Sequence, residues 1–128
     1  MSATAISANA NSSPAFMVTD SAPSFERPVD LVHLARQTLG DRALEREVLE
    51  LFKVQARAIF AQLETVSETH LRHDLAHTLK GSARAVGAWK VAEAAEACEQ
   101  AQDWNAALGD LSSRIEIALQ AIEELIRH

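Results

Sequence analysis

The stretch HLRHDLAHTLKGSARAVG, residues 70–87, decides the fold of this chain, because apolar and small residues recur in it at every third or fourth position. That spacing places them on one face of an α-helix. The pattern predicts a helix over 70–86 that ends at Gly87, since glycine commonly follows the last turn of a helix. We expect its core face to carry Leu71, Leu75, Thr78, Leu79, Ser82 and Val86.

Helical patterns precede this stretch. Pro28 and Asp30 start a short helix over 31–39. A long helix follows Asp41, a good N-cap residue, and fades at 65–69. Its expected core stripe is Leu44, Val48, Leu51, Gln55, Ala58, Ile59 and Leu63.

Two more helices are predicted toward the C-terminus. One spans roughly 88–102, and a turn follows at 103–105. The last helix carries a heptad-like seam of Leu108, Leu111, Ile115, Leu119, Ile122 and Ile126. Short turns between long amphipathic helices force antiparallel neighbours. The sequence therefore predicts an all-α fold: an antiparallel up-and-down four-helix bundle with a short additional N-terminal helix.

Composition and charge limit the function classes. The chain has 128 residues, 48% of them hydrophobic, which suits one domain with a substantial core. Its net charge of −6 argues against nucleic acid as a partner. The single cysteine, Cys98, is predicted to be a small core residue. One cysteine cannot form a disulfide within the chain, which is consistent with a reducing compartment.

The N-terminal part differs from the rest in composition. Residues 1–26 are rich in Ser, Ala, Asn and Thr and lack an apolar period, which predicts a disordered tail ahead of a domain over 27–128. No uninterrupted apolar run reaches ~18 residues, and the first residues do not resemble a secretory signal. We therefore expect a cytoplasmic monomer without membrane contact.

A strip of polar and small residues lies on the helical face opposite the core stripe of 70–86. It consists of His73, His77, Lys80, Gly81 and Arg84, which are neighbours at helical spacing. The basic residues expected around His77 are Arg72, Lys80, Arg84 and Lys90, against Asp74 alone. A neutral imidazole is a competent nucleophile near pH 7, and Lys80 can meet a phosphoryl charge as a compact cation. Gly81 leaves space beside His77 for a second protein.

The run His77-Thr78-Leu79-Lys80-Gly81-Ser82-Ala83, followed by Val86-Gly87-Ala88, resembles the histidine-containing phosphotransfer (HPt) domains of bacterial phosphorelays. The resemblance implies that His77 carries the phosphoryl group on its distal nitrogen, that Lys80 assists and that Gly81 admits the partner. It also implies that Glu99 hydrogen-bonds the other imidazole nitrogen, a position that spacing alone does not establish. The further candidates for partner contact are Arg84, His73 and Ser82.

The expected function is that of a phosphorelay carrier. Its partner is the receiver domain of a response regulator or a hybrid histidine kinase, and Mg²⁺ is expected on that receiver. The chain is expected to need no cofactor or metal of its own. It is not expected to be an enzyme, because it has no Gly-rich nucleotide-binding loop.

Two alternatives remain open from the sequence. One is a non-phosphorylated adaptor that docks a receiver through the same face. The other is a structural or metal-binding bundle that uses His70, His73 and His77.

Overall fold

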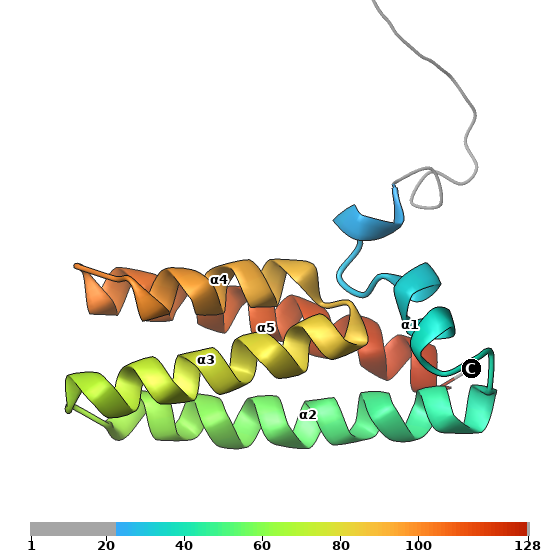
Figure 1. Cartoon of the computed structure of the whole chain (residues 1–128), viewed down its shortest axis with the longest axis horizontal. Helices are drawn as coiled ribbons and strands as arrows, with labels where there is room; N and C mark the ends of the chain where they lie inside the picture. The colour runs from blue at the N-terminus through green and yellow to red at the C-terminus, as the bar shows by residue number, and fades with distance from the viewer. Residues whose placement is uncertain (1–22, 128) are drawn as a thin grey trace, which may run out of the picture.

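Five α-helices and one short 3₁₀ turn make up residues 23–127, the part of the chain that the computed structural model describes (Figure 1). The elements are η2 (Ser24–Glu26), α1 (Leu31–Gln37), α2 (Arg42–Thr65), α3 (Thr69–Val86), α4 (Trp89–Glu99) and α5 (Trp104–Arg127). Each of the helices α2 to α5 packs on the next, and α5 closes the ring by packing on α2. The short α1 lies at the end of the bundle where α2 begins and α5 ends (Figure 1). The predicted all-α four-helix bundle with a short N-terminal helix is confirmed.

The predicted tail falls largely outside this description. Residues 1–22 lie outside the described residues. Residues 24–26 form η2, and the Ser24 hydroxyl donates a hydrogen bond to the Asp30 carboxylate. The fold therefore includes residues of the predicted tail from Ser24 onward.

Three helix ends differ from those predicted. The helix α1 ends at Gln37, two residues before the predicted end, and α4 is shorter than the predicted 88–102. The residues predicted as a turn at 103–105 include the first residues of α5, because Asp103 caps that helix by accepting a hydrogen bond from the amide of Ala106 at 3.1 Å. The predicted caps Asp30 and Asp41 are confirmed, since each accepts from a backbone amide of the helix it precedes.

The core faces of α2 and α3 are rotated from the predicted ones. The buried side chains of these two helices are Leu49, Phe52, Ala56, Leu63, Ala76, Leu79, Ala83 and Val86. Leu51 and Leu71, both predicted to be in the core, are 57% and 47% exposed. The helix α2 carries two rows of apolar residues at helical spacing, one through Leu51 and one through Phe52. Packing against both α3 and α5 buries the row through Phe52. In α3 the small residues Ala76 and Ala83 face inward, which allows close approach of a neighbouring helix.

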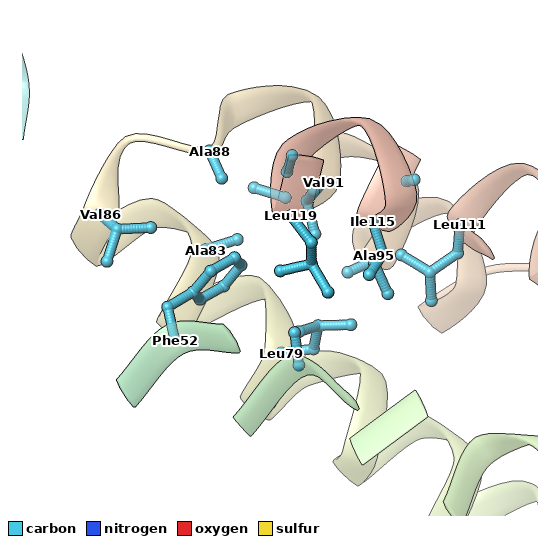
Figure 2. Close-up of a cluster of buried hydrophobic side chains, with 14 of the residues drawn as sticks. Phe52, Leu79, Ala83, Val86, Ala88, Val91, Ala95, Leu111, Ile115 and Leu119 are labelled. Atoms are coloured by element: carbon cyan, nitrogen blue, oxygen red, sulfur yellow. The ribbon is translucent and has the colours of Figure 1, made fainter. Parts of the chain in front are cut away.

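The seam of α5 lies as predicted. Leu111, Ile115, Leu119 and Ile122 are buried, and Leu108 and Ile126 pack against them from the edge. Figure 2 shows Phe52 of α2 and Leu79 of α3 pointing at Leu119 from across the bundle. The same cluster contains small side chains of the α3–α4 hairpin, Ala83, Ala88 and Ala95.

The buried carboxylate of Asp30 joins the N-terminal segment to the α3–α4 turn. It accepts hydrogen bonds from Trp89 Nε1 at 2.8 Å, from the amide of His33 at 3.1 Å, and from Ser24. Its own amide donates to the Gly87 carbonyl at 2.9 Å. Burial is the largest influence on the pKa of Asp30 and raises it, but the three hydrogen bonds together outweigh burial and lower the pKa to about 2.

No helix within residues 23–127 is long and apolar enough to cross a membrane.

Candidate functional site

The α3–α4 hairpin assembles the candidate site. The helix α3 ends at Val86, its C-cap Gly87 has the left-handed φ of 80°, and α4 begins at Trp89. So short a turn makes α3 and α4 antiparallel neighbours, and residues at similar separations before and after Gly87 lie side by side. His77 on α3 is therefore brought to Glu99 at the end of α4.

The contact between His77 and Glu99 defines the orientation of the imidazole. Nδ1 of His77 lies 3.1 Å from Oε2 of Glu99. The His77 side chain is 65% exposed, whereas that of Glu99 is only 8% exposed. An ionised carboxylate can only accept, so Nδ1 of the neutral ring is the donor and Nε2 is left unprotonated. In its neutral form the accessible imidazole therefore has Nδ1 held by Glu99 and Nε2 bare.

Lys80 shares the same carboxylate. Its Nζ lies 3.0 Å from Oε2 and 3.2 Å from Oε1 of Glu99, and the Lys80 side chain is 13% exposed. Burial is the largest influence on the pKa of Glu99 and raises it, but hydrogen bonds and positive charge from Lys80 and His77 outweigh burial and hold the pKa below its ordinary value. Glu99 is therefore ionised at neutral pH.

Gly81 leaves open space one turn beyond His77. A Cβ built on Gly81 meets no heavy atom within 4 Å, apart from its own neighbours in the helix. The residue is exposed, so the gap faces solvent. Ser82, next along the helix, is half-buried.

His73 lies one turn before His77 on the same face of α3. The two rings are stacked, with centroids 6.2 Å apart and planes 6° from parallel. Nε2 of His73 is 3.9 Å from Oε1 of Glu99, and its Nδ1 is 3.8 Å from Asp74. Three side chains of α3, those of His73, His77 and Lys80, thus converge on the single carboxylate of Glu99.

Comparison with known protein families identifies the domain. The family model described as the Hpt domain matches residues 47–127, which is more than half of the chain. The chain belongs to the Hpt domain family. Hpt domains are phosphotransfer carriers of two-component phosphorelays and interact with receiver domains. The family predicted from the motif around His77 is therefore confirmed, while no curated protein and no solved structure matches the chain.

The basic surroundings predicted for His77 are not present in this Hpt domain. Three of the four cations are paired with acids of α4, in the pairs Lys80–Glu99, Arg84–Glu96 and Lys90–Glu93. The fourth, Arg72, has its guanidinium carbon 4.4 Å from the centroid of the Trp104 ring. The prediction compared His77 only with nearby residues in the sequence, whereas the neutralising acids come from the next helix.

Sequence reasoning missed two features of the site in this Hpt domain. These are the acidic face of α4 and the approach of His73 to Glu99. The signal for the first is the spacing of 93, 96 and 99, which puts three glutamates on one side of a helix. The second depends on the register of α3 against α4, which no pattern within one helix contains.

The remaining candidates have structural explanations. Cys98 is buried as predicted, and burial, with a smaller effect of Asp110, raises the pKa of its thiol to about 11, so it stays protonated. Among residues 23–127, no group of three or more His, Cys, Asp and Glu side chains is arranged to hold a metal ion.

Proposed function

We propose that this Hpt domain is a phosphorelay carrier in which Nε2 of His77 takes up the phosphoryl group. The donor is the aspartyl phosphate of a receiver domain, or a kinase directly, and the acceptor is a receiver aspartate. In the transfer, the Nε2–P bond forms as the O–P bond of the aspartyl phosphate breaks, and the aspartate leaves as a carboxylate. The proton on Nδ1 stays in place throughout.

The observation that carries this proposal is the exposed imidazole whose Nδ1 is held by the buried carboxylate of Glu99. Attack through Nε2 develops positive charge on the ring, and a carboxylate fixed at Nδ1 offsets that charge. The held nitrogen also sets the tautomer, so that Nε2 is the nucleophile without a prior proton shift. Lys80, next to both groups, can turn toward the phosphoryl oxygens.

The partner supplies what the carrier lacks. In this proposal the receiver contributes its acidic pocket and Mg²⁺, and the Hpt domain is a reactant without a cofactor, metal or ATP site of its own. The open space at Gly81 lets the receiver surface reach Nε2. Arg84, Ser82 and His73 lie along the same helix and are proposed to contact the partner. The proposed setting is the cytoplasm, with the domain acting as a monomer.

Phosphotransfer profiling tests this function. Purified, labelled receivers of the source organism are mixed with the domain in the presence of Mg²⁺, and the label on the domain is tested for lability in acid and base. Acid-labile, base-stable label is expected, because phosphohistidine has that behaviour.

The variant His77→Gln serves as the decisive comparison. It should melt like the wild type, because the His77 side chain is 65% exposed and Glu99 still pairs with Lys80. It should lose all label. Label that persists on the variant would place the acceptor on another histidine. A receiver that binds the wild type without ever labelling it would show an adaptor instead.

A further inference from the structure

Apart from the partner contact proposed above, His73 has no part in the transfer, yet it is close to the carboxylate that holds the imidazole of His77. Its Nε2 is 3.9 Å from Oε1 of Glu99, just beyond hydrogen-bond distance, and its ring is stacked on that of His77. Its two ring nitrogens face acids, with Nδ1 3.8 Å from Asp74 on its own helix and Nε2 3.9 Å from Glu99 on α4, while the titratable ring of His77 is stacked on it and Lys80 shares the Glu99 carboxylate.

Each oxygen of Glu99 has its own hydrogen-bond donor on α3. Oε2 accepts from His77 at 3.1 Å, and Oε1 accepts from Lys80 at 3.2 Å, while Nζ of Lys80 also lies 3.0 Å from Oε2 as an ion pair. A phosphoryl group on His77 brings about two negative charges next to Lys80. If Lys80 turns to that group, Oε1 of a nearly buried carboxylate loses its donor, and an unpaired buried oxygen is destabilising.

We propose that His73 is a positioning residue. When Lys80 turns to the phosphoryl group on His77, Nε2 of His73 donates a hydrogen bond to Oε1 of Glu99 in place of Lys80. A shift of about 1 Å brings its Nε2 from 3.9 Å to the usual length of a charge-assisted hydrogen bond, about 2.8 Å to 3.0 Å. Glu99 then stays in place and keeps hold of Nδ1 of His77. The imidazolium of His73, stacked on the phosphorylated ring, also attracts the phosphoryl charge.

This role depends on pH, because a histidine ring changes charge between about pH 5 and pH 8. Protonated His73 carries a positive charge and a proton on Nε2, so it can donate a charge-assisted hydrogen bond to Glu99. Neutral His73 carries no charge, so this stabilisation is lost. The phosphoryl group on His77 should therefore be protected by His73 at mildly acidic pH and not at alkaline pH. This inference rests on the proposed function, since it concerns the lifetime of phosphohistidine at His77.

The experiment compares the wild type with His73→Phe after labelling with phosphoramidate, a donor that needs no receiver. The half-life of the label is measured from about pH 6 to about pH 8.5. At the acidic end the wild type should keep its label about two- to five-fold longer than His73→Phe, a range set by a partly exposed ion pair. The ratio should fall to about one at the alkaline end. A merely structural role of the ring would give a ratio that does not change with pH, and that result would overturn the proposal.

The helix offers a matched control in His70. His70 lies one helical turn from Asp74, with its Nε2 3.3 Å from Oδ2 of that residue, and its side chain is 78% exposed. The variant His70→Phe should match the wild type at every pH. A second test is His73→Lys, whose charge persists at alkaline pH and should lengthen the half-life there relative to the wild type.

The two proposals fail in different ways. If the wild type takes no label at His77, the carrier function fails. If the wild type is labelled there and His73→Phe loses its label at the wild-type rate across the whole pH range, the carrier function stands and the role of His73 is wrong. A loss of label from His70→Phe as fast as from His73→Phe would also overturn that role.

Discussion

Replacement of Gly81 should separate the stability of the domain from its transfer activity. Gly81 lies within α3, and a Cβ there meets no heavy atom within 4 Å beyond its own neighbours in the helix. Alanine thus adds no clash, and its better helix propensity should stabilise the domain by up to about 1 kcal/mol. For a domain of about 100 residues this raises Tm by roughly 4 °C to 8 °C. Glutamine, also a good helix former, should shift Tm in the same direction.

The Gly81→Gln substitution should slow phosphotransfer from the receiver even though it raises Tm. The Gly81→Gln side chain would stand one turn beyond His77, in the space through which the phosphorus of the receiver's aspartyl phosphate must come within about 3.5 Å of Nε2. A displacement of about 1 Å in such a geometry reduces a rate by roughly 100-fold, so receiver-dependent labelling should fall by at least that factor. Phosphoramidate is small and should still label His77. The assay is therefore parallel labelling of each variant by both donors, together with thermal melts.

Gly109 provides the control for this experiment. It is a second exposed helical glycine with no heavy atom within 4 Å of a built Cβ, and it lies on α5. Gly109→Gln should gain stability in the same way and transfer at the wild-type rate. The reasoning is refuted if Gly81→Gln unfolds the domain, which would make Gly81 a packing residue, or if it transfers normally, which would place the receiver elsewhere.

Two further predictions concern Glu99 and Asp30, two carboxylates whose pKa is lowered in the folded state. Glu99→Gln leaves the buried Lys80 without its counter-charge, so it should slow labelling by phosphoramidate and lower the free energy of unfolding at pH 7 by about 1–3 kcal/mol, as measured by urea denaturation. Because the folded-state pKa of Glu99 is depressed, its contribution is present above the unfolded-state pKa and is lost as the pH falls through the folded-state pKa, so variant and wild type should converge in acid. Asp30→Asn keeps an N-cap but loses the charge that three donors stabilise, and should cost about 1–2 kcal/mol at pH 7. That difference should shrink as the pH falls from about 4 toward 2, and a constant difference across this range would contradict the assignment.

The order of helices could be predicted from the sequence because each helix carries its own signals. Asp30 and Asp41 mark two starts, Gly87 marks an end, and the seam of α5 has a single apolar line. The rotation of α2 could not be predicted in the same way. Its lines through Leu51 and through Phe52 both have helical spacing, and the choice between them depends on which neighbours α2 contacts.

In the site, too, only the features that depend on a single helix could be predicted from the sequence. The residues of one strip on α3, His73, His77 and Lys80, follow from helical spacing alone. The placement of Glu99 beside them required the family resemblance, because its position depends on the turn that joins α3 to α4. The net charge around His77 was mispredicted for the same reason, since the acids that neutralise it lie on α4.

The register of that turn is held by residues far along the hairpin from the imidazole of His77. Gly87 adopts a φ of 80°, and a Cβ there would lie 3.0 Å from both Cβ and the carbonyl oxygen of Asp30. Asp30 in turn accepts from the indole of Trp89, the first residue of α4. Because a helix shifted by one residue moves each side chain by about 100° and 1.5 Å, a change at this turn would carry Glu99 away from His77. The placement of Glu99 beside His77 therefore depends on packing at the other end of the hairpin, and we expect substitutions at Asp30 or Gly87 to reduce the proposed phosphotransfer as well as stability.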